Sequence, residues 1–140
     1  MQTMKNYLEL WVGGLLQRNS VRLQQGITIV GHRDKHLGPR SEFARVVMTI
    51  NPAEEFDVVD NVPCRNELES LGVAWPMGVV FGLLDVLMFS GFGPLYKIKV
   101  TLDDAAYHDV DSSENAFREA GRDAGRNLIE VVKRDRLFRP

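Results

Sequence analysis

The stretch that decides the fold runs from Ile98 to Gly121 and reads IKVTLDDAAYHDVDSSENAFREAG. It begins with alternating residues, in a run that starts at Leu95 and ends at Leu102. Every second side chain of a strand points to the same face, so Ile98, Val100 and Leu102 would lie on one face and the lysines and threonine between them on the other. The run therefore predicts a half-buried strand followed by a turn.

The same stretch ends in the best-specified element, the final helix of the chain, which has Lys133, Arg134 and Arg136 near its end. Asp111 and Glu114 have the spacing of a capping box, which predicts that the side chain of Asp111 accepts from the first backbone N–H groups of the helix. The predicted helix cap consists of Asp111, Ser112, Ser113 and Glu114. Apolar residues then recur at helical spacing and predict a buried stripe. Its members are Phe117, Ala120, Ala124, Leu128 and Val131.

Three arginines, Arg118, Arg122 and Arg126, recur four residues apart on the other side of this helix. Acidic residues lie between them, so a solvated and ion-paired helix face is the default interpretation. Together with the basic residues of 31–45, the arginines could also form an RNA-facing basic patch.

The rest of the chain predicts short elements, and the order strand, strand, helix, strand, helix indicates an α+β fold with helices on one face of a sheet. No repeat or linker divides it. The expected elements are a strand over Val21–Val30, a charged loop over Gly31–Glu42, strands over Arg45–Ile50 and Phe56–Val59, a mostly irregular segment over Asn61–Gly72, and a helix from Pro76 to Met88.

The composition describes an ordinary globular domain. The chain has 140 residues, of which 44% are hydrophobic, and a net charge of −2, so a disordered chain and a uniformly basic nucleic-acid coat are both excluded. Its single cysteine, Cys64, excludes an intrachain disulfide and a cysteine-rich zinc site. The apolar run Val73–Phe92 is long enough for a membrane span, but Pro76 and the central Asp85 favour a helix buried in its own domain.

Tests for catalytic chemistry are negative. There is no Gly-Lys pair, so the chain has no phosphate-binding loop of the Gly-Lys-Ser/Thr type. His32 and His36 are four apart, but Gly31, Gly38 and Pro39 oppose the helix that a zinc site would need. The acidic residues of 103–114 lack the spacing of a calcium loop, and no nucleophile elbow is present. We therefore expect no enzymatic activity, no cofactor and no metal.

One resemblance is far more specific than these patterns. Ile98–Leu102, Tyr107–Glu114, Ala116–Phe117 and Ala120–Gly121 closely resemble the strand, turn and helix of domain IV of translation elongation factor G. Weaker similarity lies in Gly38–Val46, where the family has a glycine-rich loop that enters a strand. The resemblance covers roughly residues 20–140, so we expect a domain over residues 21–140 after an N-terminal extension over residues 1–20.

The resemblance implies an elongated, ribosomal-protein-like α+β module with a left-handed βαβ crossover. In the family the module has no catalytic role, although the full-length factor is a GTPase of the cytoplasm. Its tip reaches the decoding centre during translocation, where it takes the place of a tRNA anticodon arm. The partner implied is the ribosome or structured RNA. By position, two loops would make this contact, through Arg40 and Phe43 in the first and Tyr107, His108 and Asp109 in the second.

Departures from the family fall in these loops. Leu37, Pro39, Ser41 and Ala44 stand where the family repeats glycine, and Ala105–Ala106 replace its Gly-Ser. Alanine does not readily adopt positive φ, so the loop geometry must differ wherever glycine was needed. An alternative function is therefore a protein–protein interaction module on the same scaffold. The apolar stretch Tyr7–Leu16, with Trp11, would then support a homo-oligomer without any membrane contact.

Overall fold

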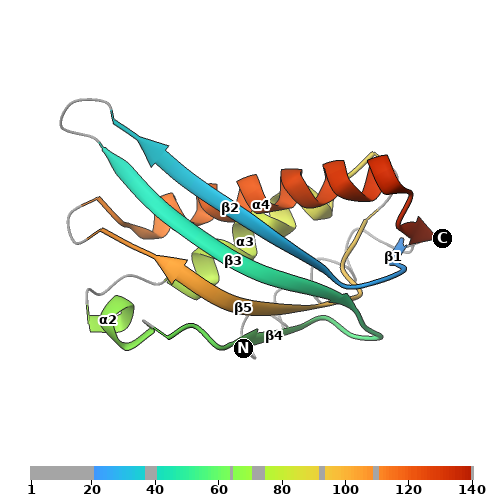
Figure 1. Cartoon of the computed structure of the whole chain (residues 1–140), viewed down its shortest axis with the longest axis horizontal. Helices are drawn as coiled ribbons and strands as arrows, with labels where there is room; N and C mark the ends of the chain where they lie inside the picture. The colour runs from blue at the N-terminus through green and yellow to red at the C-terminus, as the bar shows by residue number, and fades with distance from the viewer. Residues whose placement is uncertain are drawn as a thin grey trace.

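The computed structural model describes residues 21–36, 41–63, 65–70, 75–91, 94–108 and 111–139. The N-terminal extension and the apolar stretch within it lie outside the described residues. Figure 1 shows the arrangement of the elements. They are β1 (Arg22–Leu23), β2 (Ile27–Lys35), β3 (Glu42–Pro52), β4 (Asp57–Asp60), α2 (Arg65–Ser70), α3 (Trp75–Leu87), β5 (Ile98–Ala106), α4 (Glu114–Asp135) and β6 (Phe138–Arg139).

The main sheet has four strands in the order β2-β3-β5-β4. β2 and β3 form a long antiparallel hairpin, and β3 pairs antiparallel with β5. β4 lies parallel to β5, and α2 and α3 connect the two strands. Because the helices lie behind the sheet in Figure 1 and β5 lies beside β4, this βαβ connection is left-handed, as the resemblance implied. A second, two-stranded sheet joins β1 to β6 near the two ends of the described chain.

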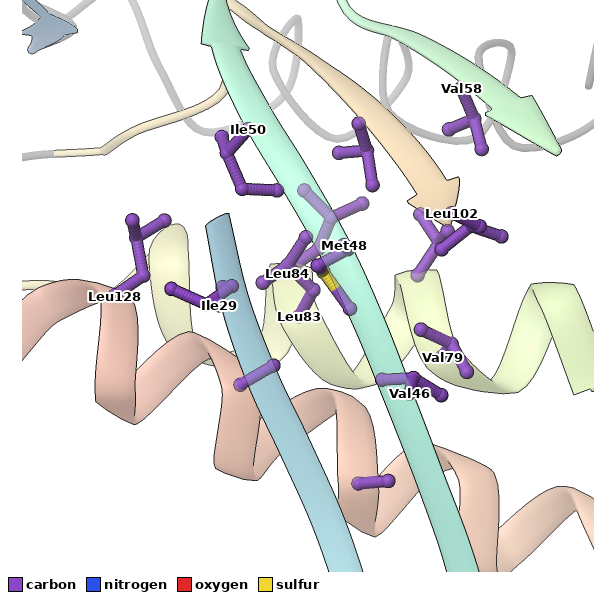
Figure 2. Close-up of a cluster of buried hydrophobic side chains, with 14 of the residues drawn as sticks. Ile29, Val46, Met48, Ile50, Val58, Val79, Leu83, Leu84, Leu102 and Leu128 are labelled. Carbon is purple, nitrogen blue, oxygen red and sulfur yellow. The ribbon is translucent and has the colours of Figure 1, made fainter. Parts of the chain in front are cut away.

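α3 and α4 cover one face of the main sheet, which confirms the expected two-layer α+β architecture (Figure 1). The core fills the space between the layers. Figure 2 shows Ile29, Met48 and Leu102, from three different strands, in one cluster with Leu83 and Leu84 of α3. The predicted alternation in β5 is correct, because its residues 98, 100 and 102 are fully buried while residue 99 is exposed.

Glycines set the distance between the two helices. A methyl group at Gly82 would collide with the backbone carbonyl of Arg118, and one at Gly121 would collide with the carbonyl of Val79. α3 and α4 therefore pack backbone against backbone, which long side chains at these positions would prevent. Trp75 and Phe117 continue the contact at the first turns of the two helices, with ring centroids 5.8 Å apart.

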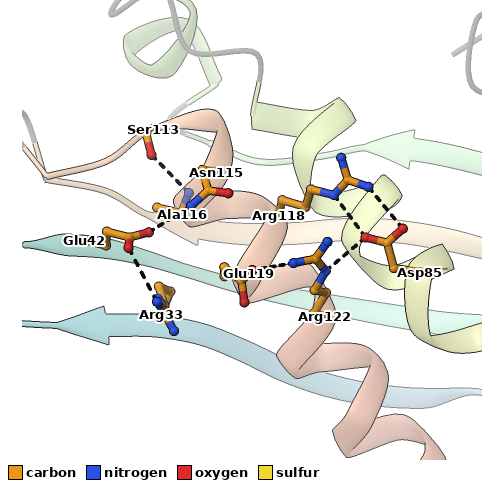
Figure 3. Close-up of polar contacts among 9 residues, drawn as sticks. All are labelled: Arg33, Glu42, Asp85, Ser113, Asn115, Ala116, Arg118, Glu119 and Arg122. Atoms are coloured by element: carbon orange, nitrogen blue, oxygen red, sulfur yellow. Dashed lines mark hydrogen bonds and ion pairs between the residues drawn. The ribbon is translucent and has the colours of Figure 1, made fainter. Parts of the chain in front are cut away.

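A polar contact joins the same helices along their outer side. Both Arg118 and Arg122 donate to the carboxylate of Asp85, each from its Nε at 3.0 Å (Figure 3). The acidic residue that interrupts the apolar run thus faces two arginines rather than the core. Two of the three stripe arginines consequently bind α3 instead of forming a free basic patch. Among the described residues no helix is long and apolar enough to span a membrane.

Several sequence-based predictions of local structure are wrong. The single strand predicted over Val21–Val30 is two strands in different sheets, β1 over Arg22–Leu23 and β2 from Ile27 onward. Gly31–Lys35 continue β2 instead of forming a loop, because they pair with β3 down to Lys35 opposite Glu42. The hairpin projects beyond the core, so its polar residues remain solvated while the backbone ladder continues. α2 lies in the segment predicted to be irregular, and Leu68 is the side chain that this short helix buries. One apolar residue gives no periodicity to detect.

α4 also closes the outer edge of β2, which is an edge strand. Gly31 lets the helix approach, because a methyl group there would collide with the backbone at Ala120. Asp123 then accepts from the backbone N–H of His32 at 3.0 Å, and Asn127 donates to the backbone carbonyl of Val30 at 2.8 Å. These side chains occupy backbone groups that an added strand would need.

Candidate nucleic-acid interface

Two chain segments far apart in the sequence meet at one end of the molecule. The β2–β3 hairpin and the connection from β5 to α4 lie side by side at the left of Figure 1. The backbone N–H of Phe43 donates to the carbonyl of Asp111 at 3.1 Å, and the hydroxyl of Ser112 donates to the carbonyl of Phe43 at 2.7 Å. We call this end the tip, and it comprises the described residues 33–36, 41–43, 107–108 and 111–115.

The residue that caps α4 is Ser113 and not Asp111, which corrects the sequence-based prediction. Ser113 has extended backbone angles, φ −153° and ψ 168°, and its hydroxyl accepts from the backbone N–H of Ala116 at 3.0 Å (Figure 3). Glu114 is the first helical residue. Asp111 and Ser112 lie before the helix because both bind the neighbouring hairpin.

His108 is held at its backbone and exposed at its ring. Its N–H donates to the hydroxyl of Ser112 at 2.8 Å, and its side chain is 58% exposed. The ring Nδ1 lies 3.6 Å from a carboxylate oxygen of Asp111. The neighbouring Tyr107 is half-buried and packs against the core. The structure thus places His108, Tyr107 and Phe43 at the same end of the molecule, while their contact with RNA or the ribosome stays a prediction.

Acidic and amide side chains also join the two segments. Glu42 accepts from Arg33 at 3.4 Å and from the side-chain amide of Asn115 at 3.2 Å (Figure 3). His36 lies 2.7 Å from the carboxylate of Asp34, and both side chains are largely exposed. With its histidines neutral, the described part of the tip carries more negative than positive charge, because the carboxylates of Asp34, Glu42, Asp111 and Glu114 outnumber Arg33 and Lys35. Its aromatic rings and hydrogen-bonding groups, rather than a positive charge, are therefore what it offers to a partner.

Several predicted site residues are not at the described tip. Arg40 and Asp109 lie outside the described residues. Arg118 and Arg122 bind α3, whereas Arg126 is exposed farther along α4. The bridge through Glu42 and Asn115 escaped the sequence analysis because it depends on the β2–β3 register. In the described part of the chain no group of three or more His, Cys, Asp or Glu residues could hold a metal ion.

Known proteins resemble this chain in sequence and in fold. A family model described as elongation factor G, domain IV, matches residues 89–132. An elongation factor G of Dehalococcoides mccartyi is 29% identical over 143 residues, which cover 91% of this chain and 20% of the relative. The factor of a second strain of that species is 30% identical over 150 residues, with the same shares covered. The chain spans about a fifth of the length of these curated relatives.

A crystal structure of a protein from Thermus thermophilus has a similar fold. Its TM-score is 0.68 at 18% sequence identity, and the match covers 77% of this chain and 16% of that one. The family match spans β5, the turn that follows it and most of α4. Residues 89–132 of this chain are thus similar to domain IV of elongation factor G, and the greater part of the chain is similar in sequence to a fifth of elongation factor G.

Proposed function

We propose that this protein acts as a non-catalytic module of translation elongation that contacts the ribosome, or structured RNA of the same kind, through its tip. The support is the family match together with relatives that are named elongation factor G. Work on ribosomes would place it in the cytoplasm. The proposal concerns binding alone, because the chain contains no Gly-Lys pair and hence no phosphate-binding loop of that kind.

The observation that carries the proposal is the joining of two distant segments around an exposed histidine. Hydrogen bonds between the segments hold the tip in one arrangement before any partner arrives. A preformed surface loses less conformational entropy on binding. The ring of His108 can stack on an unpaired base, or donate to a phosphate or a ribose hydroxyl, and single-stranded or looped RNA offers these groups.

Charge has a limited part in this contact. Arg33 is paired with Glu42, and Arg118 and Arg122 with Asp85, so these cations are already partly neutralised. Arg40, which the resemblance places in the first loop, would supply a phosphate contact. We therefore expect the affinity to fall as salt rises, as it does for every phosphate contact, but less steeply than for a uniformly basic protein.

Co-sedimentation with intact bacterial ribosomes tests the proposal. His108→Ala should weaken binding by roughly tenfold, the loss expected for one stacked base. Arg126→Ala is the matched control, because it removes an exposed side chain of α4 away from the tip and should leave binding nearly unchanged. The proposal is wrong if the wild-type protein fails to sediment with ribosomes at low salt, or if the two variants weaken binding equally.

A further inference from the structure

Ser112 lies between the two segments of the tip and contacts both. Its hydroxyl donates to the backbone carbonyl of Phe43 at 2.7 Å and accepts from the backbone N–H of His108 at 2.8 Å. Its own backbone N–H donates to the carbonyl of His108 at 3.1 Å. Ser112 and Phe43 are 69 residues apart in the chain, so this contact exists only in the folded protein.

The two hydrogen bonds fix the orientation of the Ser112 hydroxyl. A serine hydroxyl has one hydrogen to donate, and here Phe43 receives it. The oxygen accepts from His108 at the same time, so one atom sets the position of the hairpin relative to the turn. The N–H of Phe43 donates to the carbonyl of Asp111, and both polar groups of its backbone are thereby bound to residues 111–112. The hydroxyl of Ser112 thus donates to the carbonyl of a β3 residue, as a backbone N–H of a neighbouring strand would do.

The next residue, Ser113, has a different role although its side chain is identical. Its hydroxyl accepts from Ala116 within α4 and makes the helix cap. Two adjacent serines therefore bind in different directions, one across the tip and one into the helix. This pair allows the loop-to-loop contact to be changed without removing the cap.

We propose that Ser112 is a positioning residue, which locks the two segments of the tip together and so presents His108 to RNA. The inference rests on the proposed function for its RNA partner, but the locking itself does not. Without the hydroxyl, the N–H of His108 and the carbonyl of Phe43 would form hydrogen bonds with water instead, and the segment between β5 and α4 could move relative to the hairpin. A threonine retains the hydroxyl and should retain the lock.

Amide hydrogen exchange measured by NMR tests the locking without any RNA. In Ser112→Ala the amide of His108 should exchange about three- to tenfold faster than in the wild type, the factor expected for one hydrogen bond. Ser112→Thr should restore the slow exchange. Ser113→Ala should leave the exchange rate of the His108 amide unchanged, once any change in global stability has been subtracted. The exchange rates of amides in the core measure that change. Unchanged exchange in Ser112→Ala would overturn the inference whatever the protein binds.

Ribosome co-sedimentation of the same variants tests the presentation of His108. Ser112→Ala should weaken binding by about three- to tenfold, and Ser112→Thr should restore it. The double variant Ser112→Ala/His108→Ala should bind no more weakly than His108→Ala, because Ser112 acts only through His108. If His108→Ala weakens binding while Ser112→Ala does not, Ser112 has no positioning role. Equal losses in Ser112→Ala and Ser113→Ala would also overturn it, because the helix start would then be responsible. A wild-type protein that binds no ribosomes refutes the proposed function, while the exchange experiment still decides whether Ser112 locks the tip.

Discussion

At the scale of single residues, the start of α4 shows how local chemistry and tertiary contacts compete. Asp111 and Ser113 both follow the preference for a short polar residue at a helix cap. Tertiary contacts decide between them, because Phe43 binds residues 111 and 112 and leaves the next residue, Ser113, to cap the helix. A sequence pattern can locate a helix start within a few residues, but it cannot choose among neighbours of equal propensity.

Replacing Ser113 by alanine should therefore destabilise the protein, whereas the same change at Asp111 should not remove the cap. The expected loss for Ser113→Ala is about 1 kcal/mol in the free energy of unfolding, because the N–H of Ala116 loses its acceptor. Urea unfolding followed by circular dichroism measures it. A larger loss of stability in Asp111→Ala than in Ser113→Ala would contradict the assignment of the cap.

An exposed ion pair gives a small dependence of stability on pH. The hydrogen bond from Arg22 to Glu54, and the charge of Arg22, lower the pKa of Glu54 below its ordinary value. A lowered folded-state pKa stabilises the fold above the ordinary glutamate pKa, and this contribution is lost as the pH falls through the lower value. The Tm advantage of wild type over Glu54→Gln should be small, since this side chain is 83% exposed, and should shrink in acid. An advantage that grows as the pH falls would contradict the assignment.

At the scale of elements, α4 makes three kinds of contact, each from a different side of the helix. Its buried stripe packs on the sheet, its arginines bind Asp85 of α3, and two polar side chains cover the edge of β2. The stripe was predictable from periodicity. The contacts with Asp85 and with the edge of β2 were not predictable, because the sequence does not show whether a polar residue of a helix faces water, a second helix or a strand edge.

Uncovering the edge of β2 should allow two copies of the chain to associate. In the double variant Asp123→Ala/Asn127→Ala, the N–H of His32 and the carbonyl of Val30 lose their side-chain partners and become available to a second strand. Analytical ultracentrifugation should show a mass that rises with concentration. Glu130→Ala, which removes a negative charge from an exposed position of α4, serves as the control. An unchanged mass at the highest soluble concentration would show that other features protect this edge.

At the scale of the whole molecule, the core is continuous and is made of described residues from Leu23 to Val132. One cluster joins the strands of the main sheet to both covering helices, and the tip projects beyond it at one end (Figure 1). Such a division gives the tip a rigid base while leaving its loops free to differ from those of relatives. Ala105 and Ala106, which the resemblance places in the second loop, are instead the last residues of β5, and Ala105 is buried in the core.

Deleting residues 1–18 should leave this core able to fold and to bind. We expect cooperative unfolding and unchanged ribosome co-sedimentation, because the described residues from Leu23 to Val132 already form one continuous buried cluster. Light scattering on the full and shortened chains tests the alternative function. A mass that depends on concentration in the full chain, and no longer does so after the deletion, would favour an interaction module built on the apolar stretch Tyr7–Leu16.

The sequence by itself determined the α+β class, the strand in β5, the helices α3 and α4, and the resemblance to domain IV of elongation factor G. These follow from short-range patterns, since alternation, helical periodicity and a contiguous motif are all written within about thirty residues. Only the tertiary structure decided that Ser113 caps α4, that β2 extends to Lys35, and that Arg118 and Arg122 bind Asp85. Each of these depends on a partner more than ten residues away or in another element, and a local pattern contains no information about such a partner.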